Sequence, residues 1–422
     1  MPQLRQIRGC MAGFRGSGFS LPRKHVKFFW RSLGKAELLE IETKGWYGTM
    51  IIKNAEVYTE NGIFEKKDIY ISGGKFVEKP EESDQEIVDG AGCYAIPGLT
   101  DIHFHGCMGY DFCDGTEEAI QAIADYEASV GVTTIVPATM TFSEEKLMQI
   151  SHAARAHQNG KGAELCGINM EGPFIAPAKK GAQNGKYIHR PDAAMFDRLQ
   201  EASGHLYKLV DLAPEVEGAM EFIREKKDEV VLSIAHTTAD YETAKAAIEA
   251  GVHHMTHLYN AMNGINHREP GPVIAASDDE RCEAELICDG VHIHPAVVRN
   301  TLKMFGEDRV IFVSDTMMAA GLDDGMYELG GQPVTVRGNR ATLEDGTLAG
   351  SNTNLMECMK TAVRLMKIPL ETAVRCAAVN PAKSVGIYDR YGSITPGKTA
   401  NVVLLEKEDL NTKQVILRGE IL

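Results

Sequence analysis

Six ionisable side chains each follow a short apolar run, and their types are those that bind divalent metal ions. The six are His103, His105, Glu171, His236, His257 and Asp315. Imidazole and carboxylate groups hold Zn²⁺ or Fe²⁺ and can leave one coordination position open for water. Metal-dependent hydrolases use this combination, so the sequence predicts a site for one or two divalent ions.

Each of these residues also has an ordinary explanation. Alternate residues of a strand share one face, but His-x-His pairs also occur by chance, as the second pair at 292–294 shows. His236 and His257 could be core or loop histidines, and Glu171 could lie in a turn. Asp315 could cap the N-terminus of a following helix. Their common position after successive apolar runs favours the metal site.

Eight apolar runs alternate with helical patterns such as Glu117–Val130 and Tyr241–Ala250. The runs are Gly98–Phe104, Val132–Pro137, Leu165–Met170, Leu206–Leu212, Val230–Ala235, Val252–Thr256, Ala284–Cys288 and Val310–Val313. Eight strand-then-helix units predict an α/β protein with a parallel (β/α)8 TIM-type barrel, whose active site lies at the carboxyl ends of the strands. A doubly wound sheet is the alternative, but no Gly-rich phosphate-binding motif follows the first run.

Short strand patterns separated by turn residues lie on both sides of the eight units. We therefore expect residues 50–97 and 391–422 to form one small β-sandwich domain from both ends of the chain. Residues 98–390 are then the catalytic barrel. Residues 1–49 differ from the rest, with nine Lys/Arg and three Glu. They are compatible with a disordered tail, a start upstream of the natural one, or an organelle address.

Charge and cysteine content limit the partners and the compartment. The net charge is −15, and subtracting about +6 for residues 1–49 leaves about −21 for the remainder. A body this acidic repels nucleic acid and anionic membranes, so we expect neither as a partner. No apolar run is long enough to span a bilayer. The nine cysteines include no CxxC pair, so we expect reduced thiols in the cytoplasm.

Several motifs together resemble a known family. The segment Ile96–Gly106, which contains His103 and His105, resembles the opening signature of the amidohydrolase superfamily. Glu171, the segment His257–Met262, Arg268–Gly271 and Leu348–Ser351 narrow the resemblance to its N-acetylglucosamine-6-phosphate deacetylases. The resemblance covers residues 50–422. It implies hydrolysis of the acetamido group of this sugar phosphate to D-glucosamine 6-phosphate and acetate, in amino-sugar catabolism and cell-wall recycling.

The resemblance also implies roles for the metal-site residues. Glu171, His236 and His257 match the ligands of the metal that all members keep. His103 and His105 match the extra pair of members with a second metal, which Glu171 bridges. Asp315 matches the acid/base residue and also lies among the metal-site residues. The ion is expected to be Zn²⁺ or Fe²⁺. The sequence does not distinguish between the two, because N and O ligands of this kind do not select one metal strictly.

The small-molecule sugar phosphate would be bound by residues outside this set. Those that the resemblance implies are Asn260, Ala261, Arg268, His292 and Leu348, together with Gln183, which stands where many members carry a histidine and can bind substrate but cannot titrate. The backbone at Asn260 and Ala261 could donate to the phosphate, and Arg268 could pair with it. In the family the matching arginine comes from the neighbouring subunit, so we expect a homodimer. Arg268 could instead form a surface salt bridge, His292 could be a loop residue, and Leu348 could serve packing alone.

Other classes of protein remain as rivals. One is another amidohydrolase, a cyclic amidase or a deaminase; a lysine after the fourth strand would favour the former, but the sequence there is Leu212-Ala213-Pro214-Glu215. The second is a non-catalytic scaffold on the same fold. Such scaffolds usually lose metal ligands, whereas all the expected ones are present here.

Overall fold

The computed structural model of the chain describes residues 49–79 and 85–422. The basic segment 1–49 lies outside the described residues apart from Thr49. Its three interpretations, a disordered tail, a start upstream of the natural one and an organelle address, therefore stay predictions. Within the described ranges, no helix has both the length and the apolar character needed to cross a membrane.

Parallel strands form the centre of the fold. They are β8 Leu99–Asp101, β11 Val132–Ile135, β12 Ala138–Thr139, β13 Glu164–Leu165, β14 Ile168–Glu171, β15 Tyr207–Leu212, β16 Val231–Ile234, β17 His254–Met255, β18 Glu283–Ile287 and β19 Val310–Val313. Seven pair in the order β12-β14-β15-β16-β17-β18-β19, and three more pair in the order β13-β11-β8. Every pair in both sheets is parallel. The prediction of an α/β protein with parallel strands is confirmed.

The seven-stranded sheet curls, because both of its ends contact the segment that follows β8. At one end, the backbone nitrogen of Ala138 donates to the oxygen of Phe104 at 2.7 Å. At the other end, the nitrogen of Asp315 donates to the oxygen of His103 at 2.8 Å. Strand ends that are far apart in the sequence are therefore brought to one place.

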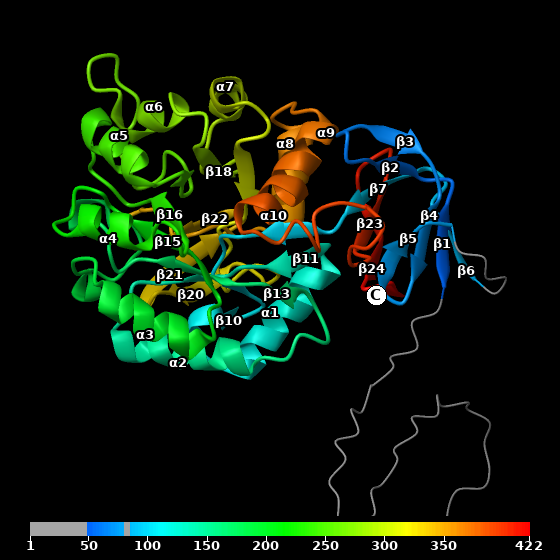
Figure 1. Ribbon diagram of the computed structural model, residues 1–422, viewed down its shortest axis with the longest axis horizontal. Helices are drawn as coiled ribbons and strands as arrows, with labels where there is room; N and C mark the ends of the chain where they lie inside the picture. The colour runs from blue at the N-terminus through cyan, green and yellow to red at the C-terminus, as the bar shows by residue number, and fades with distance from the viewer. Residues whose placement is uncertain (1–48, 80–84) are drawn as a thin grey trace, which may run out of the picture. The chain divides into compact units, whose positions relative to one another are not determined.

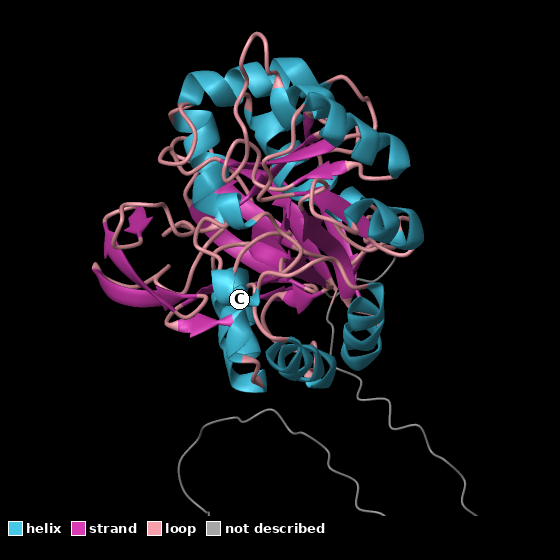
Figure 2. Cartoon of the chain, turned by 90° about the vertical axis from the view of Figure 1, so that its left-hand side faces the viewer, coloured by secondary structure: helices cyan, strands magenta, loops and turns pink. Residues whose placement is uncertain are grey.

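Helices lie outside the parallel strands (Figures 1 and 2); those before residue 310 connect successive parallel strands, and three more follow β19. They are α1 Glu117–Ser129, α2 Glu144–Ala156, α3 Ala193–Ser203, α4 Ala219–Lys226, α5 Tyr241–Ala250, α6 Gly271–Ser277, α7 Pro295–Phe305, α8 Leu355–Arg364, α9 Leu370–Val374 and α10 Asn380–Ser384. Side chains fix several starts: Thr116 accepts from the Ala119 nitrogen, and Asp240 accepts from the Thr243 nitrogen. The helix predicted over Tyr241–Ala250 is observed with the same bounds as α5. The helix predicted over Glu117–Val130 is observed as α1, which ends one residue earlier, at Ser129.

Two smaller sheets share a second core. One has the order β5-β4-β1-β6, and the other has the order β25-β24-β23-β7-β2-β3. Their strands are β1 Met50–Lys53, β2 Glu56–Tyr58, β3 Phe64–Lys66, β4 Ile69–Ser72, β5 Lys75–Val77, β6 Glu86–Asp89, β7 Cys93–Pro97, β23 Val402–Glu406, β24 Thr412–Leu417 and β25 Glu420–Ile421. Buried residues of both sheets, among them Ile52, Ile71, Ala95 and Leu404, form one apolar cluster. Because β7 pairs with β23, strands from distant parts of the chain share a sheet.

A further antiparallel sheet follows β19. Its strands are β20 Gly325–Leu329, β21 Gln332–Arg337 and β22 Arg340–Thr342. The short hairpin of β9 Gly106–Cys107 and β10 Tyr110–Asp111 follows β8 in the same way. Both insertions come directly after the carboxyl end of a parallel strand, on the side where the predicted site residues lie.

Two predicted strands are shorter than the apolar runs that suggested them. The run Gly98–Phe104 is a strand only to Asp101, and the run Val252–Thr256 is a strand only at His254–Met255. The backbone leaves the sheet at these points: the Asp101 carboxylate accepts from the nitrogen of His103, and His257 has a φ of 27°. After β8 the apolar residues Ile102 and Phe104 continue past the last ladder bond, so the sequence pattern overestimates the length of this strand.

Candidate metal centre and active site

One group of candidate metal ligands contains His103, His105 and Glu171. The two histidines follow β8, and Glu171 is the last residue of β14. Glu171 Oε2 lies 3.7 Å from His103 Nε2 and 3.3 Å from His105 Nε2. All three side chains are buried. This cluster is called group A below.

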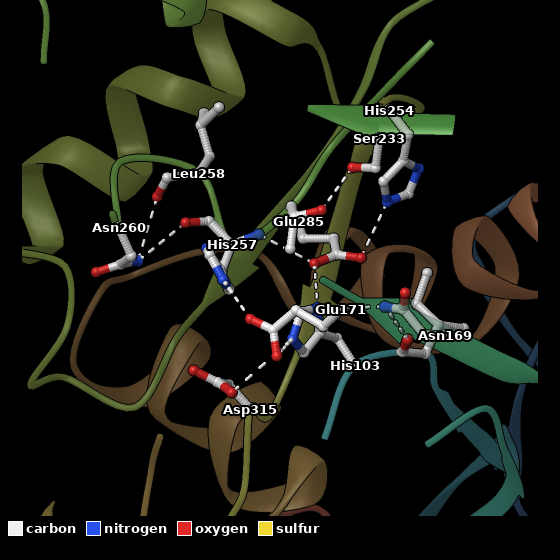
Figure 3. A network of polar contacts seen from close by, with 12 residues as sticks. His103, Asn169, Glu171, Ser233, His254, His257, Leu258, Asn260, Glu285 and Asp315 are labelled. Atoms are coloured by element: carbon white, nitrogen blue, oxygen red, sulfur yellow. Dashed lines mark hydrogen bonds and ion pairs between the residues drawn. The ribbon is translucent and has the colours of Figure 1, made fainter. Parts of the chain in front are cut away.

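A second group contains Glu171 again, together with His236 and His257. His236 follows β16, and His257 follows β17. Glu171 Oε1 lies 2.8 Å from His236 Nε2 and 3.2 Å from His257 Nε2. Figure 3 shows Glu171 between His103 and His257. This cluster is called group B, and Glu171 directs one oxygen toward each group.

Residues two positions past the ends of β16, β17 and β19 have left-handed backbones. The φ angles are 44° at His236, 27° at His257 and 50° at Asp315. Residues with a Cβ rarely adopt such angles, and those that do often lie at functional sites. Here the sharp change of direction brings each side chain to the same point above the sheet.

The donor atoms of groups A and B fit a divalent cation. Four imidazoles and one carboxylate are ligand types that suit Zn²⁺ and Fe²⁺. His103 Nε2 and Glu171 Oε2 are buried, face each other, and have no hydrogen-bond partner in the described part of the chain. Buried polar atoms normally have a partner. A cation bonded to both atoms satisfies them, so the residues fit the ion that the chemistry requires.

The surroundings of Glu171 and His103 shift the pKa of each side chain. Burial raises the pKa of Glu171, but the neighbouring imidazoles of His103, His236 and His257 lower it more, so it lies well below its usual range. Burial lowers the pKa of His103, while the charge of Glu285 raises it above its usual range. The carboxylate of Glu171 is therefore ionised at neutral pH, as a metal ligand must be.

Asp315 follows β19 and faces group A. Its Oδ1 lies 3.3 Å from His105 Nε2 and 4.0 Å from His103 Nε2. Burial raises its pKa, but the hydrogen bond from His105 lowers it below the ordinary value. No helix follows Asp315 directly, so the alternative that it is a helix N-cap is wrong. An ionised carboxylate here can accept a proton.

A cavity of about 360 Å³ opens above the two groups. Ten of the twelve residues that the sequence singled out line it. They are His105, Glu171, Gln183, His236, His257, Asn260, Ala261, His292, Asp315 and Leu348. His103 is fully buried behind the cavity. The structure thus brings together residues separated by more than two hundred positions.

Contacts orient three of the predicted substrate residues. The Gln183 side-chain oxygen accepts from the nitrogen of Thr141 at 2.7 Å. The Asn260 amide donates to the backbone oxygen of His257 at 3.1 Å, which fixes the turn rather than leaving the amide free. His292 Nδ1 lies 2.8 Å from the Asp289 carboxylate.

Arg268 lies apart from these residues. It is exposed and lines a different cavity, of about 650 Å³, with Tyr241 and Asn266. Its guanidinium contacts His267 Nε2 at 3.0 Å. Within one chain the structure does not bring Arg268 to the metal groups, so its contact with substrate stays a prediction that needs a second subunit.

Three residues that orient the site were missed from the sequence. Glu285, on β18, contacts His103; Asp289 contacts His292; and the backbone oxygen of Lys179 lies 2.8 Å from His236 Nδ1. Glu285 interrupts an apolar run, and this signal could have revealed it. The Lys179 contact uses a backbone atom, so no side-chain pattern could have predicted it.

The fold and this site are those of amidohydrolases, and comparison with known proteins agrees. Residues 94–422 match the Amidohydrolase family. The chain belongs to this family, as the motifs around His103 and Glu171 predicted.

Particular relatives are similar over nearly their whole length. The chain is 37% identical over 384 residues to "N-acetylglucosamine-6-phosphate deacetylase" of Bacillus subtilis, covering 88% of this chain and 97% of the relative. It is 32% identical to "N-acetylgalactosamine-6-phosphate deacetylase" of Escherichia coli O157:H7, covering 88% and 99%. A solved N-acetyl-D-glucosamine-6-phosphate deacetylase of Mycobacterium smegmatis, in complex with N-acetyl-D-glucosamine-6-phosphate, is 31% identical. It has a TM-score of 0.82 and covers 89% of this chain and 99% of its own.

Proposed function

We propose that the chain hydrolyses the acetamido group of N-acetyl-D-glucosamine 6-phosphate to D-glucosamine 6-phosphate and acetate, in amino-sugar catabolism and cell-wall recycling. The observation that carries this proposal is the cavity above groups A and B, in a chain that matches deacetylases over nearly their full length. A cyclic amidase is less well supported. Glu215, which follows β15, accepts from Thr237 and Thr238 instead of facing group A or B.

Two functional groups of the site perform the hydrolysis. A divalent ion held by Glu171, His236 and His257 would supply Lewis acidity and a water of lowered pKa. Asp315 accepts the proton of the attacking water as the carbon–oxygen bond forms. It then gives that proton to the nitrogen as the carbon–nitrogen bond breaks, so one carboxylate serves as base and then as acid. His103 and His105, together with Glu171, would hold a second ion.

Substrate contacts complete the proposal. Gln183, Asn260, Ala261, His292 and Leu348 line the cavity and would surround the sugar and its phosphate. His292 is held by Asp289; burial lowers the pKa of His292, while its hydrogen bond to the Asp289 carboxylate raises that pKa above the ordinary value.

The larger organisation is proposed on the same basis. The curled parallel sheet and β8 would close as a (β/α)8 barrel over residues 98–390. The support for this is a backbone hydrogen bond that joins the segment after β19 to the segment after β8. Residues 50–97 and 391–422 would form the β-sandwich domain. We propose a cytoplasmic homodimer, which is supported by the eight cysteines of the described residues, all free and buried, and by the position of Arg268 at a different cavity from that of the metal groups.

Acetate release from purified enzyme tests the proposed function. N-acetyl-D-glucosamine 6-phosphate should be a much better substrate than the unphosphorylated sugar. The N-acetylgalactosamine phosphate should be assayed beside it, because one relative bears the name of that epimer's deacetylase. Equal rates with phosphorylated and unphosphorylated sugars would contradict the proposal.

A further inference from the structure

Glu285 is a fully buried carboxylate on β18 that contacts residues of both metal-ligand groups. Its Oε2 lies 3.0 Å from His103 Nδ1 and 3.0 Å from the backbone nitrogen of His257. Its Oε1 lies 3.0 Å from His254 Nε2, and these contacts are drawn in Figure 3. We propose that Glu285 is the positioning residue that fixes the tautomer of His103 and thereby sets the affinity of the group A metal ion.

The contact decides which nitrogen of His103 carries the hydrogen. An ionised carboxylate accepts but cannot donate, so Nδ1 must be the donor. A longer contact of 3.4 Å from the Asn169 amide would require the opposite tautomer. The charge-assisted bond to Glu285 is shorter and therefore prevails. Nε2 is left with its lone pair directed toward Glu171, which is the form that a metal ligand needs.

His254 supports this arrangement from the other side. Its Nε2 donates to Glu285, and its Nδ1 lies 3.6 Å from Glu283 and 3.3 Å from the hydroxyl of Ser384. A buried carboxylate is much less costly when it is paired in this way. Glu285 is therefore held in place independently of His103.

Groups A and B depend on Glu285 to different degrees. In group A, Glu285 contacts the ligand ring of His103 itself. In group B, it contacts only the backbone of His257, whose φ of 27° it helps to maintain. Loss of the negative charge should therefore weaken the group A ion more than the group B ion.

The experiment is a competition titration of the full-length enzyme with Zn²⁺ against a chromophoric chelator, comparing wild type with Glu285→Gln. A carbonyl oxygen at this position can still accept from His103, but the charge is lost. We expect roughly 10- to 100-fold weaker binding of the group A ion and a much smaller change for the group B ion. Glu285→Asp, which keeps the charge but shortens the reach, should also weaken the group A ion and serves if the Gln variant is unstable.

Two controls separate positioning from general stability. Glu127→Gln makes the same change at another fully buried glutamate, whose oxygens have no hydrogen-bond partner in the described chain; it should bind both ions as wild type does. In a His103→Asn background, adding Glu285→Gln should cause no more than the small change expected for the group B ion. Equal loss of both ions, or a roughly 10-fold or larger further loss in that background, would overturn the inference.

The inference rests on the proposed two-ion site. The titration distinguishes a failure of that site from a failure of the role of Glu285. Wild type that binds a single ion would overturn both. Two-ion binding that is unchanged by Glu285→Gln would overturn the role of Glu285 alone.

Discussion

At the scale of single residues, the site is defined by where its carboxylates point. Glu171 faces four imidazoles, whereas Asp315 faces mainly His105 and the cavity. Both are buried, and neighbouring histidines hold the pKa of each below its usual range. The two carboxylates can therefore have different tasks, one in holding metal and the other in moving protons.

Asp315→Asn should retain metal and lose most of its turnover. An amide oxygen can still face His105, but an amide cannot accept and return a proton, so kcat should fall by roughly 10²- to 10⁴-fold. Acetate release and metal analysis of the same sample measure the two effects. The control is Asp323→Asn, the same change at an exposed position. An unchanged kcat would remove Asp315 from the acid/base role.

At the scale of secondary-structure elements, β17 and β18 are joined by a buried ion pair. His254 on β17 donates to Glu285 on β18. Burial lowers the pKa of His254, but Glu283 and Glu285 raise it more, to about 10. A histidine with a raised pKa stabilises the fold fully below its unfolded pKa, and this contribution is lost as the pH rises through about 10.

His254→Asn should therefore be destabilising at pH 7. The loss should be roughly 3 to 5 kcal/mol in the free energy of unfolding, because Glu285 loses its buried partner. The difference from wild type should shrink as the pH approaches 10, since wild-type His254 then loses its proton as well. Chemical denaturation across this pH range measures it. The adjacent His253→Asn is the control, and a difference that does not change with pH would contradict the ion-pair explanation.

The presence of the parallel strands and the polar residues that follow them could be predicted from the sequence, because both are local patterns. The exact strand lengths could not, because the apolar residues Ile102 and Phe104 lie past Asp101, where β8 ends. The partners of the site residues were also not predictable in general. Glu285 contacts His103 across 182 positions, and only the curl of the sheet brings them together.

At the scale of the whole molecule, the metal ions and a second subunit should each contribute to the working enzyme. Groups A and B join residues from four separate strand ends, so a cation bound there crosslinks parts of the sheet that the chain itself connects only through long helical segments. Arg268 lies outside the cavity of its own chain.

Removing the metal should lower the thermal stability of the protein. A ligand that binds only the folded state, present at 100 times its Kd, stabilises that state by about 2.7 kcal/mol. Dialysis against a strong chelator should lower Tm and abolish acetate release, and added Zn²⁺ should restore both. Glu171→Gln should have a Tm that chelation no longer changes. Full activity after exhaustive chelation would exclude a metal-dependent reaction.

Arg268→Ala should raise KM for the phosphorylated sugar and hardly change the rate with unphosphorylated N-acetylglucosamine. The physical reason is the loss of one guanidinium–phosphate pair, contributed by a neighbouring subunit. Mixing Arg268→Ala chains with inactive Asp315→Asn chains should restore activity in mixed dimers. An equal effect on both sugars would remove Arg268 from phosphate binding, and the absence of restoration would contradict its action across subunits.

The shared carboxylate makes the number of bound ions adjustable by substitution. Glu171 gives one oxygen to group A and the other to group B. Replacing His103 and His105 would leave all three residues of group B in place, whereas replacing Glu171 would remove a ligand from both groups. One-ion and two-ion forms are therefore separated by few amino-acid changes, and selection could move between them while the reaction continues.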